Sequence, residues 1–140
     1  MFSFQRSLLP RRIRPIREFA ESEIIMPPGG QYGNEPFRCD RQPFANLFLE
    51  QVELAESGRA PWTNFVWTGS VQSGKTLVGI IVLMYAVFEL REPVIFGVPT
   101  MKGVSKKWLR DIEPIIRASN YRDLMPSRGP GSAGGTDVAR

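Results

Sequence analysis

Apolar residues recur at helical spacing between positions 44 and 57, where Phe44, Leu47 and Val52 fall on one side of a helix. Proline is favoured at the first position of a helix, and Pro43 stands there. Glycine is favoured just after the last position, and Gly58 follows the run. The pattern therefore predicts a helix over 44–57.

Further along the chain the pattern alternates between short apolar runs and longer helical ones. Residues 64–68 and 94–98 are short, apolar and rich in β-branched or aromatic side chains, which predicts two buried strands. Residues 77–88 are apolar on almost every side, which is typical of a buried helix. A membrane span needs about 20 such residues. The last periodic run, 103–118, predicts a helix that Pro114 kinks or divides.

The order strand, helix, strand, helix predicts an α/β fold with parallel strands and right-handed crossovers. Two strands are few for a parallel sheet, which is normally covered on both faces. We therefore expect the N-terminal portion of a larger α/β domain. The expected organisation is an Arg-rich arm over 1–26, half of an α/β domain over 27–125, and a Gly/Ser/Pro-rich tail over 126–140 that continues a truncated domain.

Composition excludes several kinds of chemistry. The sequence holds no histidine and a single cysteine, Cys39. These counts exclude Ser-His-Asp catalysis, histidine-ligated metals and an intramolecular disulfide. Cys39 is expected to be an inert thiol. Chemistry is left to Lys, Ser, Thr, acidic side chains, Arg and backbone amides.

The basic residues are unevenly distributed. The formal net charge is +4, and five arginines precede the first acidic residue, Glu18. Such an arm is typical of segments that contact nucleic-acid phosphates. It is also similar to a mitochondrial transit peptide, and it is equally compatible with a solvated arm. A second group of basic residues could also contact DNA phosphates, with a solvated helix face as the alternative: Lys102, Lys106, Lys107 and Arg110.

The loop between the first predicted strand and the apolar helix matches the phosphate-binding pattern G-x-x-x-x-G-K-[ST] with no departure. Its glycines permit close backbone approach, and its amides can surround a β-phosphate. The amino end of the following helix adds unpaired N–H groups. The residues predicted to bind the nucleotide are Gly69, Ser70, Val71, Gln72, Ser73, Gly74, Lys75 and Thr76.

Two of these residues have distinct predicted roles. Lys75 should reach the β/γ-phosphate oxygens and act in catalysis, and the Thr76 hydroxyl should ligate Mg²⁺. The predicted cofactors are therefore ATP and Mg²⁺. Hydrolysis also needs an acidic residue for the metal, which is usually placed after an apolar strand. The stretches that end at Glu89 and Asp111 do not fit that pattern.

The chain resembles the N-terminal part of the ATPase domain of tailed-phage terminase large subunits, the GpA-like group. The stretches that carry this resemblance are YGNEPFRCDRQPF, NFVWTGSVQSGKT and VIFGVPTMKGVSKKWLRDIEPII. It implies a P-loop NTPase fold with a RecA-like parallel sheet, and an ATP-driven motor that packages viral DNA. Full-length members also carry an endonuclease domain. It further implies an adenine-contacting segment before the loop, for which Gln42 is the candidate, with a simple helix-entry role as the alternative.

The resemblance also implies partners and a compartment. The implied partners are double-stranded viral DNA, a terminase small subunit, a portal or procapsid, and further copies of the chain, with no membrane. The implied compartment is the cytoplasm of a bacterial host. Two other hypotheses stay open. One is another P-loop ATPase of the helicase-like kind, and the other is a truncated, non-hydrolysing fragment or a module that binds DNA or the motor. Trp62, Trp67 and Trp108 are expected to pack in the core, with base stacking as the alternative.

Overall fold

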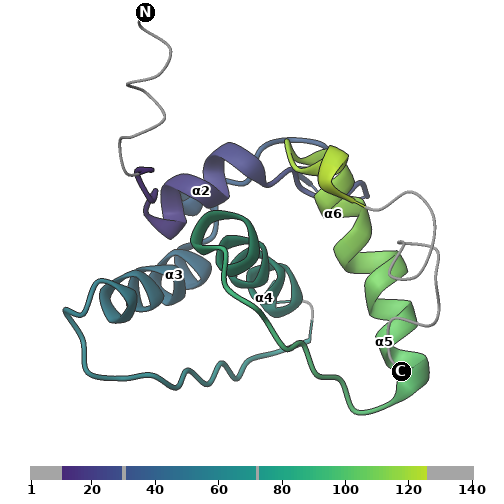
Figure 1. The fold of residues 1–140 in the computed structure, drawn as a ribbon. Helices are drawn as coiled ribbons and strands as arrows, with labels where there is room; N and C mark the ends of the chain where they lie inside the picture. Colours follow the sequence, from purple (N-terminus) through teal and green to yellow (C-terminus); the bar gives the residue numbers. More distant parts are fainter. Residues whose placement is uncertain (1–10, 30, 72, 126–140) are drawn as a thin grey trace, which may run out of the picture.

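The computed structural model describes residues 11–29, 31–71 and 73–125. Figure 1 shows α4 at the centre, with α3 on one side and the rod of α5 and α6 on the other. The helix α2 lies over α3 and over the turns that follow α4. The main helices are α2 (Ile16–Glu23), α3 (Pro43–Glu56), α4 (Lys75–Met84), α5 (Met101–Lys107) and α6 (Glu113–Ala118). Shorter helical turns are η1 (Cys39–Arg41), η2 (Tyr85–Leu90), η3 (Trp108–Ile112) and η4 (Arg122–Leu124).

The predicted α/β fold with a RecA-like parallel sheet is wrong for the residues that the structure describes. Helices make up the regular structure there, and the one β pairing is an isolated antiparallel bridge between Ile25 and Pro36. Segments 64–68 and 94–98, predicted as buried strands, are irregular and mostly exposed. Both segments are fully described, and no backbone hydrogen bond joins them. A run of β-branched residues becomes a strand only where a neighbouring strand accepts and donates its backbone hydrogen bonds. The composition of these two segments was therefore not enough to predict strands.

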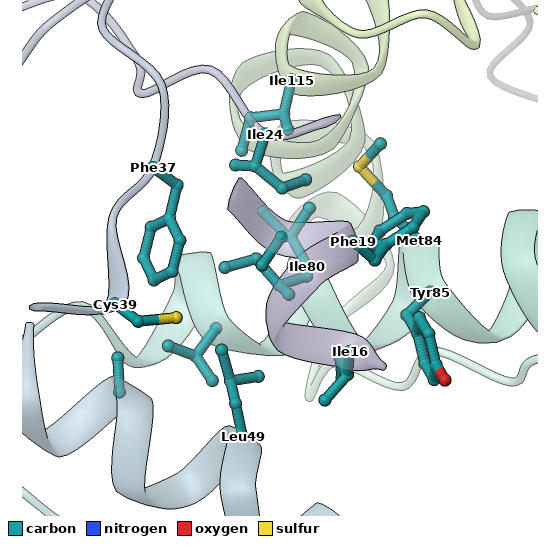
Figure 2. Packing of buried hydrophobic residues seen from close by; sticks show 14 of the residues in the cluster. Ile16, Phe19, Ile24, Phe37, Cys39, Leu49, Ile80, Met84, Tyr85 and Ile115 are labelled. Carbon is teal, nitrogen blue, oxygen red and sulfur yellow. The ribbon is translucent and has the colours of Figure 1, made fainter. Parts of the chain in front are cut away.

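Helix α2 lies inside the stretch that the sequence assigned to an Arg-rich arm. Pro15 precedes it, and Ile16, Phe19 and Ala20 are fully buried at helical spacing. Figure 2 shows Ile16 and Phe19 among buried side chains from α3, α4 and α6. The second half of the arm is thus part of the hydrophobic core. The largest fully buried side chains are Phe19, Phe37, Ile16, Ile24, Leu49, Ile80, Ile81, Met84 and Val78.

The central helix α4 agrees with the predicted buried helix. It begins at Lys75, directly after Gly74 in the left-handed region (φ +80°), and its Val78, Ile81 and Met84 side chains are fully buried. The wider turns of η2 continue it to Leu90. The rod over 101–118 also agrees with the prediction, because Pro114 stands in the first turn of α6 and the helix is widened just before it, in η3.

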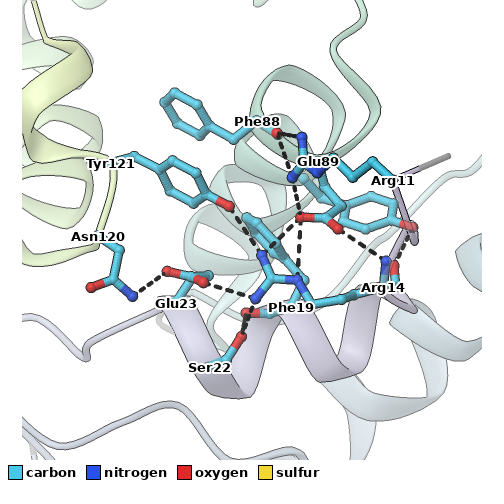
Figure 3. A network of polar contacts seen from close by, with 10 residues as sticks. Arg11, Arg14, Phe19, Ser22, Glu23, Phe88, Glu89, Asn120 and Tyr121 are labelled. Atoms are coloured by element: carbon cyan, nitrogen blue, oxygen red, sulfur yellow. Dashed lines mark hydrogen bonds and ion pairs between the residues drawn. The ribbon is translucent and has the colours of Figure 1, made fainter. Parts of the chain in front are cut away.

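A network of ion pairs ties α2 to the far end of the central helix (Figure 3). The guanidinium of Arg14 donates to Glu89 at 2.8 Å and to Glu23 at 2.8 Å. Its Nη2 atom also lies 3.0 Å from the Tyr121 hydroxyl, and Arg11 donates to Glu89 at 3.0 Å. The Glu89 side chain is only 1% exposed. Removing one member of such a buried pair leaves a charge without compensation.

This network is connected through helix α4 to the loop that matches the phosphate-binding pattern, residues 69–76. Glu89 lies in η2, which extends α4 at its carboxyl end, while the loop precedes its amino end. The Tyr85 hydroxyl adds a hydrogen bond to the Arg14 carbonyl at 2.8 Å. Fixing η2 against α2 therefore fixes the direction of the helix whose first turn carries the phosphate-binding motif.

Candidate phosphate-binding site

Of the two glycines that bound the motif, Gly74 is required by its backbone conformation, and Gly69 lies close to neighbouring side chains. A Cβ atom added to Gly69 would lie 3.3 Å from the Ser73 hydroxyl oxygen and 3.6 Å from the Trp67 ring nitrogen. Gly74 has a φ of +80°, a conformation that side chains with a Cβ rarely adopt. The loop is therefore folded back on itself between these two positions, as a phosphate-wrapping loop requires. Gln72 lies outside the described residues.

The side chain of Lys75 turns back into the loop. Its ammonium donates to the Gly69 carbonyl at 2.8 Å, to the Ser73 hydroxyl at 3.1 Å and to the Ser70 carbonyl. These acceptors hold a cation at the mouth of the loop, beside the amino end of α4. The first N–H groups of that helix have no acceptor within the helix. A lysine ammonium beside helix-terminal N–H groups is an arrangement that can attract an anion.

Thr76, the predicted Mg²⁺ ligand, faces a second lysine. The Lys107 ammonium lies 3.3 Å from the Thr76 hydroxyl oxygen and 2.7 Å from an Asp111 carboxylate oxygen. Arg110 donates to the other Asp111 oxygen at 3.2 Å. Burial alone would raise the pKa of Asp111, but the hydrogen bonds from Lys107 and Arg110 outweigh it and lower that pKa. Asp111 is therefore a carboxylate at neutral pH.

A cavity of about 730 Å³ opens between the motif and the rod of α5 and α6. Ser73, Gly74, Lys75 and Thr76 line it on one side, and Arg110 and Asp111 on the other. The sequence does not predict Asp111 as a metal-binding acid, because Arg110 interrupts the apolar run before it. The signal that could have found it is its position four residues after Lys107, on the helix facing the loop.

Gln42 lies next to the motif although it is 32 positions before Gly74 in the sequence. Its side-chain oxygen would be 3.4 Å from a Cβ atom added to Gly74. A second cavity, of about 470 Å³, is lined by Arg41, Gln42, Pro43 and Phe44 together with Ser73 and Gly74 of the loop. The structure thus brings the predicted base-contacting segment and the phosphate loop to one place. Gln42 also directly precedes Pro43, the first residue of α3, which agrees with the alternative helix-entry role, whereas its contact with a base stays a prediction.

These residues fit a magnesium nucleotide in the chemistry of their donors. The loop supplies a lysine ammonium and helix-terminal amides for phosphate oxygens. Thr76 supplies a hydroxyl oxygen near one carboxylate. Mg²⁺ is usually held by one or two protein oxygens together with waters and substrate phosphates, rather than by a cage of protein ligands. Within the described ranges, no group of three or more Cys, Asp or Glu side chains is close enough together to hold a metal ion.

Other residues named from the sequence have structural surroundings. Trp67 stacks on Phe48 with ring centres 5.0 Å apart, and Trp108 packs against the core. The expectation that Trp62 packs in the core is wrong, because its side chain is exposed. Burial, reinforced by the negative charge of Glu21, raises the pKa of Cys39 to about 11, which keeps the thiol protonated. Arg6 and the tail over 126–140 lie outside the described residues.

Comparisons with protein-family models, with characterised proteins and with solved structures found no match for this chain. None of the helices in ranges 11–29, 31–71 and 73–125 combines the length and apolar character needed to cross a membrane.

Proposed function

We propose that the chain binds the polyphosphate of ATP, with Mg²⁺, through residues 69–76. The observation that carries this proposal is the position of Lys75, whose ammonium is bonded to Gly69, Ser70 and Ser73 within the loop. A solvated lysine would have no reason to fold onto three acceptors of a glycine-bounded loop. Incoming phosphate oxygens would take the place of these neutral acceptors and form stronger, charge-assisted hydrogen bonds.

The neighbouring cavity supports a nucleotide in preference to free phosphate. Gln42 offers an amide that can donate to and accept from a base edge. Phe44, which is 80% exposed beside the same cavity, offers an aromatic face on which a base can stack. Loop and cavity share Ser73 and Gly74, so one ligand can contact both.

Equilibrium binding of a fluorescent ATP analogue, followed by anisotropy, tests this function. Wild-type protein should bind the analogue with Mg²⁺, and unlabelled ATP should compete. Lys75→Ala should weaken binding by about 10- to 100-fold, since a hydrogen bond to a charged group contributes about 1.5–3 kcal/mol. The matched control is Lys102→Ala, because Lys102 is exposed on α5. Equal affinity in wild type and Lys75→Ala would overturn the proposal.

The resemblance to terminase large subunits supplies the biological role that we propose for this ATP site. The chain would be the ATP-binding segment of a motor that moves double-stranded viral DNA into a procapsid. Exposed Lys102, Lys106 and Arg110 lie on one helical rod and offer a surface for DNA phosphates. In a reconstituted packaging reaction, Lys75→Ala should abolish ATP-dependent DNA uptake. Uptake at the wild-type rate would contradict this role.

A non-hydrolysing nucleotide- or DNA-binding module is the second candidate. What favours it is that Asp111, the carboxylate that lines the cavity beside the motif, is already paired with Lys107 and Arg110. Measuring phosphate release by the purified chain separates the two candidates. Turnover that Lys75→Ala abolishes would favour the ATPase, and ATP binding without turnover would favour the module.

A further inference from the structure

Lys107 joins two elements that are far apart in the sequence. Its bond to Asp111 spans one helical turn and needs no special explanation. Its contact with the Thr76 hydroxyl, at 3.3 Å, does not follow from the helix, because Thr76 lies in the first turn of a different helix, α4, across the cavity. One ammonium therefore bridges a hydroxyl oxygen and a carboxylate oxygen at the edge of the phosphate loop.

The two oxygens are of the kind that Mg²⁺ prefers. A hydroxyl and a carboxylate on either side of a cation, with the phosphates of a nucleotide completing the shell, match the usual magnesium arrangement. The side chain of Asp111 is only 18% exposed and faces the same cavity as Lys75 and Thr76. Arg110 holds its other oxygen, so the oxygen facing Lys107 is the one available to a metal or to a metal-bound water.

We propose that Thr76 and Asp111 are the protein side of a Mg²⁺ site, and that Lys107 holds the place of the cation until the magnesium nucleotide binds. This inference rests on the proposed ATP function and deepens it. Two cations cannot occupy the space between the same two oxygens. Binding of Mg²⁺ therefore releases the Lys107 ammonium, which can then contact the phosphate oxygens of the bound nucleotide. Lys107 and Mg²⁺ thus compete for the same two oxygens.

The competition predicts opposite effects for two substitutions. Asp111→Asn removes the carboxylate and should weaken the Mg²⁺-dependent part of ATP binding by about 10-fold or more, while binding measured in EDTA stays close to wild type. Lys107→Met removes the competing cation, so a lower Mg²⁺ concentration should be enough to reach half of the Mg²⁺ effect. A purely structural ion pair would instead give both variants the same defect, with and without Mg²⁺.

The experiment titrates Mg²⁺ at fixed fluorescent ATP analogue and follows anisotropy for wild type, both variants and Asp123→Asn. Asp123 is a matched control, because its side chain is 89% exposed. Circular dichroism checks that each variant is folded. If Asp111→Asn fails to fold, the direction of the Lys107→Met shift decides the question alone.

The outcomes separate the two proposals. Absence of ATP binding by wild type would contradict the proposed function itself. Normal ATP binding whose Mg²⁺ dependence is unchanged in Asp111→Asn would overturn the metal site and leave the function standing. Equal losses in both variants at every Mg²⁺ concentration would also overturn it. Opposite shifts of the two variants, with Asp123→Asn at the wild-type value, are the expected result.

Discussion

Replacing Arg14 by methionine should destabilise the chain strongly, although Arg14 is far from the phosphate loop. Its guanidinium is the link between Glu23, in α2, and Glu89, after α4. Both carboxylates are nearly inaccessible, with 7% and 1% of their side chains exposed. Methionine would fill much of the same space but would leave both acids without this partner.

The magnitude follows from what remains after the substitution. Breaking a buried pair by removing one partner costs about 3–5 kcal/mol. Here Glu89 would keep Arg11, at 3.0 Å, and Glu23 would keep the Asn120 amide, at 2.9 Å. We therefore expect the low end, a loss of about 3 kcal/mol in the free energy of unfolding. Against a typical total of about 5–15 kcal/mol, this is a large fraction.

Urea denaturation followed by circular dichroism measures the effect. The matched control is Arg12→Met, because Arg12 pairs with Glu18 at the surface, with side chains 79% and 48% exposed. An exposed pair contributes about 0–1 kcal/mol, so the control should stay near wild type. If Arg14→Met is no more destabilising than Arg12→Met, the network does not fix α2 against the end of α4.

Three further predictions concern single residues. Gly74→Ala should lower the free energy of unfolding by about 1–2 kcal/mol, because the φ of Gly74 is +80°. Gly79→Ala should instead raise the free energy of unfolding by about 0.5–1 kcal/mol, because Gly79 lies inside α4 with open space at its Cβ position. Urea denaturation of both variants measures the sign of each change. Cys39 should react slowly with a thiol reagent at pH 8 in the native chain and rapidly in urea, since burial raises its pKa to about 11. Burial opposes the charged form of Glu89, but the hydrogen bonds from Arg14 outweigh burial and lower the pKa of Glu89. Glu89 therefore stabilises the fold fully above its ordinary pKa of 4.5, and this stabilisation is lost as pH falls through the lower native pKa. Urea denaturation at a series of acidic pH values should show the loss, and the loss should be smaller in Arg14→Met.

The helices were predictable where side-chain periodicity and terminal residues agree. Pro43 and Gly58 frame α3, and the glycine-lysine pair opens α4. Helix α2 was not predicted, although Ile16, Phe19 and Ala20 have helical spacing, because the arginines before and within it are typical of a solvated arm. A helix satisfies its own backbone hydrogen bonds, so local sequence is enough to indicate it.

The predicted strands failed for the opposite reason. The backbone of a strand is satisfied by another strand, so a sequence such as 94–98 specifies pairing only when a partner is present. In the structure Ile95 is fully exposed, and the segment pairs with nothing in the described part of the chain. The loop over 69–76 needs no distant partner, because its geometry depends on its own glycines and on the first turn of one helix. Its sequence is therefore enough to predict it.

Tertiary structure adds to the site what spacing could not supply. Lys107 and Asp111 lie beside the loop only because the rod of α5 and α6 packs against α4 through Ile112 and Ile115. Because Lys107 and Asp111 belong to no sequence motif, their spacing could not assign them to the site.

The charges around the site restrict the kind of ligand it can hold. Lys75 and Arg110 line the first cavity, Arg41 lines the second, and Lys107 bonds to Thr76 between loop and rod. Asp111 is the one acidic residue among those that line the first cavity, and it is already paired, whereas the described residues that line the second cavity include no acid. Positive charge facing a partly enclosed space is balanced most directly by a bound anion. A triphosphate carries enough charge to engage several of these groups at once, and a single phosphate does not. Affinity should therefore rise from phosphate to ADP to ATP, and equal affinity for all three would mean that only the loop binds.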